Sequence, residues 1–213
     1  MSHAHTKIAA IILAGGAAKR FGYPKPLLLW QGQSFLYHIT KAAMAGQLSP
    51  IIIVSGAYTE QLQLIAQELL VQIIHNPHWE QGQSTSVKAG VSALPIETEA
   101  AIFLLADQPL ITAALLQKMA LTYNQTHAPV IAPFIGEKRG NPLLFSRETF
   151  QDLTKLKGDE GGRTILNMYP MLKLNWDDSS ILFDVDTPQD YERLKLITPQ
   201  SRATNTSGTS LSS

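Results

Sequence analysis

Short runs of apolar residues alternate along most of the chain with segments in which apolar residues recur three and four positions apart. The runs predict buried strands and lie at residues 8–13, 51–54, 71–74, 101–106, 130–132, 142–145, 171–174 and 181–185. The periodic segments predict amphipathic helices, often with a Ser or Thr to cap them, and lie at residues 34–45, 58–70, 84–94, 112–124 and 147–156.

Strands that are apolar throughout, rather than at every second position, are typical of a parallel sheet that is buried on both faces. Their alternation with helices predicts an α/β fold of three layers, in which helices cover both sides of a mostly parallel central sheet. Ligands of such sheets bind beyond the carboxyl ends of the strands. The residues directly after each strand are therefore the candidates for chemistry.

The length of 213 residues fits one domain better than two. We assign residues 1–197 to a single domain and expect residues 198–213, which are rich in Ser and Thr and lack periodicity, to be a disordered tail. No run approaches the roughly 18 apolar residues of a membrane span. The run at residues 8–13 is too short for a signal peptide and is followed by glycines, so we expect a cytoplasmic protein.

The composition excludes several classes of function. Seventeen basic residues balance seventeen acidic ones, and this neutrality argues against a polybasic binder of nucleic acid or membranes. The absence of cysteine excludes zinc-thiolate sites, iron–sulfur clusters and cysteine nucleophiles.

A glycine-rich turn follows the first predicted strand. Gly15 and Gly16 lack side chains, so their backbone N–H groups can approach phosphate oxygens closely. Arg20 and Lys25 add two positive charges, the first able to bind phosphate bidentately and the second as a point charge. The alternative is a tight strand-to-helix turn that carries surface bases.

Carboxylates follow two of the later strands. Asp107 comes directly after the strongly apolar run 101–106, where an oxygen ligand for a magnesium ion on nucleotide phosphates would lie; otherwise it caps the helix near Thr112. Asp184 and Asp186 lie two apart on a predicted strand end and so face the same side, where one or both could complete the metal site. The alternative for Asp186 is a cap for the helix that starts at Pro188.

The turn, read as Leu13-Ala-Gly-Gly-x-x-x-Arg-Phe-Gly-x-x-Lys25, resembles the signature loop of the nucleotidyltransferases that act on molybdopterin. The resemblance continues through five further motifs, in order, at residues 76–87, 104–110, 140–145, 158–163 and 183–190. Together they look most like the molybdenum cofactor cytidylyltransferases. That family implies a Rossmann-like nucleotidyltransferase fold and a magnesium-dependent transfer of CMP from CTP to molybdopterin, with release of pyrophosphate.

The resemblance also assigns roles to residues of this sequence. Nucleotide binding falls to eight of them: Leu13, Ala14, Gly15, Gly16, Arg20, Lys25, Gln83 and Ser86. Arg20, Lys25 and Asp107 become the catalytic residues, with Asp107 and Asp186 or Asp184 as metal ligands, Asp186 preferred. For the acceptor we look to Gly140, Asn141 and Arg163, because a flexible loop there carries one fixed cation toward a phosphate or pterin; the alternative is a solvated loop that closes a helix. For Gln83 and Ser86 the alternative is a plain Ser cap at the start of a helix.

Nucleotidyl transfer needs positioning and charge neutralisation rather than a protein nucleophile, because the attacking group is already a phosphate oxygen. The sequence agrees with this, since neither its serines nor its histidines form a nucleophile motif.

The sequence departs from the usual cytidylyltransferase loop at three positions, with Gly15 in place of Ala, Ala18 in place of Ser and Phe21 in place of Met. The Gly-Gly pair is closer to the guanylyltransferase loop, so CTP and GTP both remain open.

The acceptor also remains open between a molybdopterin and a sugar or polyol phosphate. A non-catalytic module that binds nucleotide and delivers cofactor is a further alternative. A molybdoenzyme or its maturation factor would be the partner downstream.

The net charge of zero is an average over two unlike regions. The first 59 residues contain five basic residues and no acidic one, whereas six acidic residues lie between Asp177 and Glu192. We expect folding to bring the basic loop opposite Asp107 and the Asp184/Asp186 pair, with a triphosphate and magnesium between them.

Overall fold

The structure is a computed structural model that describes residues 7–16, 21–158 and 165–197. Arg20, Arg163 and the predicted tail 198–213 lie outside these residues. The assignment of residues 1–197 to one domain stays a prediction.

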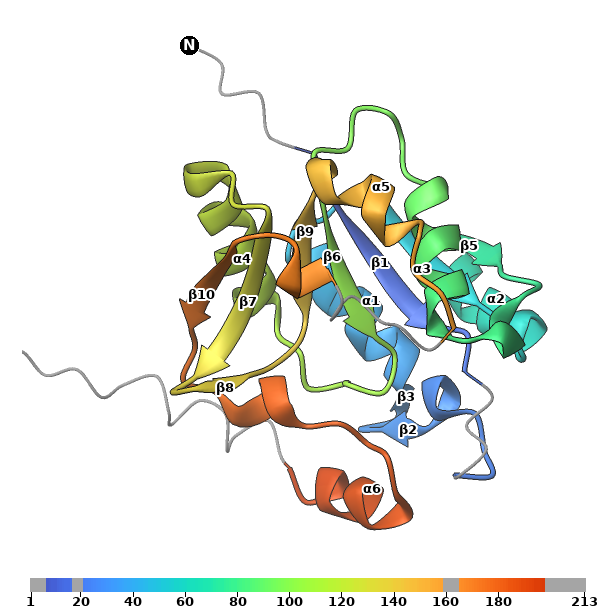
Figure 1. Ribbon diagram of the computed structural model, residues 1–213. Coiled ribbons are helices and arrows are strands. Elements are labelled where there is room, and N and C mark those ends of the chain that lie inside the picture. The colour runs from blue at the N-terminus through green and yellow to red at the C-terminus, as the bar shows by residue number, and fades with distance from the viewer. Residues whose placement is uncertain (1–6, 17–20, 159–164, 198–213) are drawn as a thin grey trace, which may run out of the picture.

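A single large sheet runs through the centre of the molecule (Figure 1). Its strands are β1 (Ile8–Ala14), β4 (Ile51–Ser55), β5 (Gln72–His75), β6 (Ala100–Leu105), β7 (Val130–Ile135), β8 (Lys138–Arg139), β9 (Leu143–Ser146) and β10 (Met171–Asn175). The order across the sheet is β10-β7-β9-β6-β1-β4-β5, and β8 pairs with the carboxyl end of β7. Among the described strands of this sheet, only β9 and β8 run antiparallel to their neighbours, which confirms a mostly parallel sheet.

Helices cover both faces of the sheet and give the predicted three layers. They are α1 (Phe35–Ala45), α2 (Thr59–Glu68), α3 (Gln83–Ser92), α4 (Ala113–Thr126) and α5 (Phe150–Leu153). A further helix, α6 (Pro188–Lys195), lies off both faces and packs in a separate apolar cluster. Alternate residues of β1 face opposite layers: Ile12 packs in the cluster with α1, α2 and α4, whereas Ile11 packs in the cluster with α3 and α5. Both isoleucines are fully buried, which explains why β1 is apolar at every position.

Local chemistry sets the starts of the helices. The Ser34 hydroxyl accepts a hydrogen bond from the Tyr37 N–H at 3.1 Å and caps α1, and Thr112 caps α4 in the same way. Thr187 and Asp190 form a capping box at the start of α6.

Two of the expected elements differ in the structure. The helix expected at 147–156 is a 3-10 turn, Arg147–Thr149, followed by the single turn of α5. The strand expected at 181–185 is wrong: Ser179–Leu182 form a 3-10 helix capped by the Asp178 side chain, and the chain continues without strand pairing. The sequence pattern misled because Ile181 and Val185 are both buried, but in different apolar clusters.

A third cluster of apolar residues lies beyond the carboxyl ends of the strands. A small hairpin, β2 (Leu29–Trp30) with β3 (Gln33–Ser34), packs there beside α6 (Figure 1). Phe35, Leu110 and Leu194 are the centre of this cluster, and the Tyr191 hydroxyl donates to the Leu29 carbonyl at 2.7 Å. The N-terminal and C-terminal parts of the chain thus meet at the edge of the sheet where ligands bind.

The described helices include none that is long and apolar enough to cross a membrane.

We predict that Gly90→Ala destabilises the packing of α3 on the sheet. A Cβ at Gly90 would lie 2.6 Å from Cγ2 of Ile11, which is fully buried. Overpacking costs about 1–3 kcal/mol, and so short a distance to a fully buried side chain belongs in the upper part, about 2–3 kcal/mol. Less the gain of roughly 1 kcal/mol in helix propensity, the free energy of unfolding should fall by about 1–2 kcal/mol in urea denaturation. Lys88→Ala, at an exposed position of the same helix, is the control; an equal or higher stability of Gly90→Ala would contradict the packing described.

Candidate functional site

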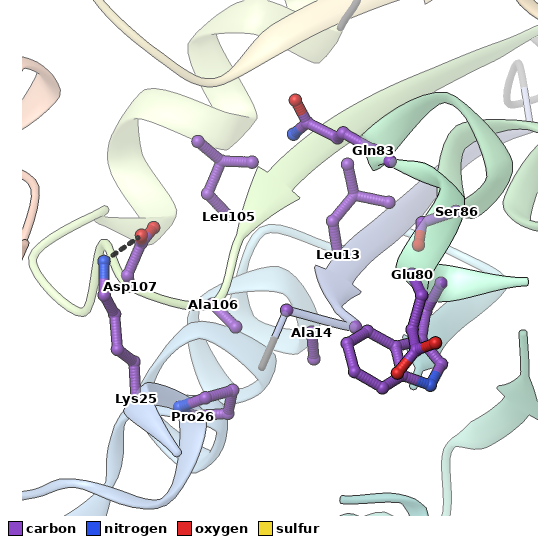
Figure 2. A pocket seen from close by; sticks show the side chains of 14 residues that line it. Leu13, Ala14, Lys25, Pro26, Glu80, Gln83, Ser86, Leu105, Ala106 and Asp107 are labelled. Atoms are coloured by element: carbon purple, nitrogen blue, oxygen red, sulfur yellow. Dashed lines mark hydrogen bonds and ion pairs between the residues drawn. The ribbon is translucent and has the colours of Figure 1, made fainter. Parts of the chain in front are cut away.

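A cleft of about 540 Å³ opens at the carboxyl ends of β1 and β6. From β1 the chain adds β4 and then β5 on one side, and it then returns to add β6 on the other side of β1. The strand order therefore reverses between β1 and β6, which is where ligands bind in such sheets. The lining residues are Leu13, Ala14, Gly15, Gly16, Lys25, Pro26, Trp79, Glu80, Gly82, Gln83, Ser86, Leu105, Ala106 and Asp107. Figure 2 shows Lys25 and Asp107 on one side, and Ser86 and Glu80 on the other, with the end of β1 between them.

The two glycines after β1 do different things. A Cβ at Gly15 would lie 3.0 Å from the Ser86 Oγ, so Gly15 lets the first turn of α3 approach the end of β1. A Cβ at Gly16 would meet no atom of the described residues within 4 Å, so on that side the backbone of Gly16 is open. Gly16 therefore leaves its peptide accessible to a ligand in the cleft, whereas Gly15 is needed for packing.

Gly56, which sequence reasoning missed, packs against two residues of the cleft lining, Gly15 and Trp79. It follows β4, and a Cβ there would lie 2.3 Å from the Gly15 carbonyl oxygen and 2.8 Å from Cβ and Cγ of Trp79. Trp79 lines the cleft and is half-buried. The signal for Gly56 was its place directly after a strand, which is the reasoning that found Asp107.

The start of α3 forms the opposite wall of the cleft. Gly82 precedes the helix with a φ of 110°, a conformation that favours glycine, and the helix has no side-chain cap. The alternative of a plain Ser cap is therefore not observed. The buried Asn76 side chain donates to the Ser86 hydroxyl at 3.0 Å and to the Thr85 hydroxyl at 2.8 Å, which fixes this turn against the end of β5.

Lys25 joins two carboxylates that are distant in sequence. Its Nζ lies 3.1 Å from Asp107 Oδ2 and 2.6 Å from Asp186 Oδ1, and only 17% of the lysine side chain is exposed. Partial burial lowers the pKa of Lys25, but the hydrogen bonds and attraction of Asp186 and Asp107 outweigh it, so this pKa lies above its ordinary value. The ammonium thus stays charged and marks a point where two carboxylates face one cation.

The two cap alternatives are excluded. Thr112, not Asp107, caps α4, and Thr187, not Asp186, caps α6. The carboxylates of Asp107 and Asp186 instead form ion pairs with Lys25.

Asp184 has a different partner. Its Oδ1 accepts a hydrogen bond from the side-chain amide of Gln108, which is 1% exposed. Asp184 is exposed as a whole residue, but its carboxyl group is surrounded by protein atoms. The resulting loss of solvation raises the pKa of Asp184 above its ordinary value. Repulsion from Asp107 and Asp186 adds to the rise, while the Gln108 hydrogen bond opposes it.

The carboxylates fit a divalent cation that arrives with phosphates. Mg²⁺ prefers oxygen ligands and usually takes one or two carboxylates, with phosphates and water at its other positions. Asp107 and Asp186 supply two carboxylates directed at one point. Within the described ranges, no three His, Asp or Glu side chains lie close enough to hold a metal ion by themselves.

Two of the three predicted acceptor residues, Gly140 and Asn141, lie outside the cleft lining. Gly140 packs against Ile181, where a Cβ would lie 2.5 Å from the Ile181 carbonyl oxygen, and the Asn141 N–H donates to that oxygen at 3.0 Å. Both follow β8 at the carboxyl edge of the sheet and have structural contacts there. Arg163, the third of them, is outside the described residues, as is Arg20.

Eight predicted positions thus come together around one cleft: Leu13, Ala14, Gly15, Gly16, Lys25, Gln83, Ser86 and Asp107. Asp186 joins them through Lys25. The positions that sequence reasoning missed are Gly56, Asn76, Trp79, Glu80 and Gln108.

Comparison with known proteins matches the chain to one family. The family described as "MobA-like NTP transferase domain" matches residues 10–174. "Molybdenum cofactor cytidylyltransferase" of Escherichia coli (strain K12) is 30% identical over 185 residues, which cover 86% of this chain and 93% of the relative. "Purine catabolism protein PucB" of Bacillus subtilis (strain 168) is 28% identical over 204 residues, or 88% of this chain and 96% of the relative.

Solved structures share the fold. The crystal structure of Rv0371c from Mycobacterium tuberculosis H37Rv in complex with manganese has a TM-score of 0.78 at 22% identity, covering 91% of this chain and 100% of that one. The likeness agrees with the three-layer arrangement and the mostly parallel sheet described above.

We predict that Gly56→Ala disturbs the cleft wall and that Gly16→Ala does not. The new methyl at position 56 would overlap the Gly15 carbonyl and Trp79, so the free energy of unfolding should fall by about 1–3 kcal/mol. At position 16 the methyl meets no atom within 4 Å in the part of the chain that the structure describes, and the change should stay within about 0.5 kcal/mol. Chemical denaturation of both variants measures the difference, and equal stabilities would show that the contact around Gly56 is not as described.

Proposed function

The chain belongs to the MobA-like NTP transferase family, and we propose that it transfers CMP from CTP to a molybdopterin-type acceptor with the help of a magnesium ion. The observation that supports this most directly is that Lys25, which lines the cleft together with Asp107 and the glycines after β1, contacts both Asp107 and Asp186. A lysine and two carboxylates beside a bare backbone turn can bind a triphosphate together with its metal ion.

In this proposal the two walls of the cleft hold different parts of the nucleotide. The peptide of Gly16 and the charges of Arg20 and Lys25 bind the triphosphate. The other wall, with Trp79, Gln83 and Ser86, takes the base and sugar. The Asn76 hydrogen bond to Ser86 keeps that wall in place before the nucleotide arrives.

The reaction needs no protein nucleophile. A phosphate oxygen of the acceptor forms a bond to the α-phosphorus of CTP while the bond from that phosphorus to the oxygen leading to the β-phosphorus breaks, and pyrophosphate leaves. Asp107 and Asp186 would hold the magnesium ion, which when bound neutralises phosphate charge and orients the α-phosphate. Lys25, no longer held by these carboxylates, would bind the phosphates and stabilise the leaving pyrophosphate.

The choice of CTP follows the E. coli relative, a cytidylyltransferase that aligns over 86% of this chain. GTP is the alternative, because the Gly15-Gly16 pair resembles the guanylyltransferase loop. A molybdopterin acceptor would place a molybdoenzyme or its maturation factor downstream, whereas a sugar or polyol phosphate would not.

Pyrophosphate release, measured with each of the four NTPs, Mg²⁺ and either molybdopterin or a set of sugar and polyol phosphates, tests the proposal. We expect release with CTP and molybdopterin together. Release with GTP, or with a sugar or polyol phosphate, would replace the nucleotide or the acceptor proposed here. Binding of CTP without release from any NTP would instead indicate a nucleotide-binding delivery module.

We predict that Asp107→Asn lowers kcat about 100-fold or more, because it removes a charged ligand from the proposed metal site. The fold should persist, since Lys25 keeps its ion pair with Asp186. Asp177→Asn, the same change at an exposed residue, is the control and should leave kcat unchanged. Full activity of Asp107→Asn, with a circular dichroism spectrum like that of the unchanged protein, would remove Asp107 from the site.

A further inference from the structure

Two contacts hold the segment Asp184–Asp186 to the residues that follow β6, and a third joins Asp186 to Lys25. The Val185 N–H donates to the Asp107 carbonyl at 3.1 Å, and the Val185 side chain is fully buried. The Gln108 side chain donates to Asp184, and Lys25 Nζ reaches Asp186 at 2.6 Å. The first two contacts hold the segment to the residues that follow β6, whichever cation Asp186 faces.

Gln108 is placed in a way that packing alone does not explain. Its side chain is 1% exposed, and its Oε1 has no hydrogen-bond partner among the described residues. A buried amide oxygen without a donor is unfavourable, and Met would fill similar space without that penalty. The gain from an amide at this position is therefore the hydrogen bond from its nitrogen to Asp184.

Asp186 contacts the Lys25 ammonium, whereas Asp184 contacts Gln108. The Lys25 ammonium lies within 3.1 Å of oxygens from Asp107 and Asp186, so a positive charge is seen between these two carboxylates. Asp184 makes no ion pair among the described residues, and its Oδ1 is engaged by Gln108. Because Asp184 and Asp186 flank the anchored Val185, fixing the first limits where the second can point.

We propose that Gln108 and Asp184 are a positioning pair, which fixes this segment so that Asp186, and not Asp184, faces the cation beside Asp107. The inference rests on the proposed function in one respect, since it takes that cation to be the metal ion that accompanies the nucleotide. It assigns Gln108 and Asp184 no contact with the substrate. Their effect is on the placement of Asp186.

This assignment gives each substitution a different expected effect. Asp186→Asn removes a ligand, whereas Asp184→Asn keeps an oxygen that can accept the Gln108 hydrogen bond. Gln108→Met and Asp184→Ala each break that bond and leave every proposed ligand in place. Since both break the same contact, combining them should cost little more than either alone.

The experiment measures Mn²⁺ affinity by electron paramagnetic resonance in the presence of a CTP analogue with a non-hydrolysable α,β-bridge, so that no turnover is needed. Gln108→Met and Asp184→Ala should each weaken Mn²⁺ binding about 10-fold, in the range known for residues that orient metal ligands. The double variant should match the single ones, Asp184→Asn should stay close to the unchanged protein, and Asp186→Asn should show the largest loss. Thermal melting of each variant confirms that it is folded, and Asp184→Ala, at an exposed residue, serves if Gln108→Met does not fold.

Two results would overturn the inference alone. One is a loss for Asp184→Asn as large as that for Asp186→Asn, which would make Asp184 a ligand. The other is an unchanged Mn²⁺ affinity for Asp184→Ala, which would leave the Gln108 contact without effect on Asp186. If the unchanged protein binds no Mn²⁺ with the CTP analogue, the proposed function fails first, and this inference fails with it.

Discussion

Two carboxylates held side by side repel each other unless a cation lies between them, and the rest of this site depends on how the chain meets that requirement. Asp107 and Asp186 are joined by the ammonium of Lys25, although the lysine is 82 and 161 positions away from them along the chain. The ion pairs bring an N-terminal region without acidic residues against a C-terminal region rich in them. Although the protein has no net charge, opposite charges thus meet at the carboxyl edge of the sheet.

The fold supplies the place for this contact. Parallel strands end at one edge, and β1 lies between β4 and β6. The residues that follow these three strands, namely the glycines after β1, Gly56 and Asp107, are therefore brought close together by the sheet alone. The hairpin of β2 and β3 and the helix α6 then pack beyond that edge around Phe35 and Leu194, which brings Asp186 within reach of Lys25. The nucleotide site we propose is thus formed by the centre of the sheet together with a small apolar cluster at its end.

The sequence predicted the features that depend on local pattern, and less of those that depend on contacts across the chain. Most strands of the large sheet, most helices, the glycine turn and the place of Asp107 followed from periodicity and from position after a strand. The strand expected at 181–185 failed because periodicity cannot tell one buried face from two separate ones. Nothing in the sequence indicated that Trp79 and the Gly15 carbonyl pack against Gly56, or that Gln108 is buried with Asp184 as its partner, because these contacts join segments that are distant along the chain.

The central claim is that Lys25 balances Asp107 and Asp186 until a nucleotide brings a metal ion to them. Mn²⁺ titration of the unchanged protein, with and without CTP and in the absence of acceptor, tests this most directly. The account predicts weak binding of Mn²⁺ alone, because the ammonium already lies between the two carboxylates, and much tighter binding once CTP is present and Lys25 can turn to the phosphates. Equal Mn²⁺ affinity in the two conditions would contradict it.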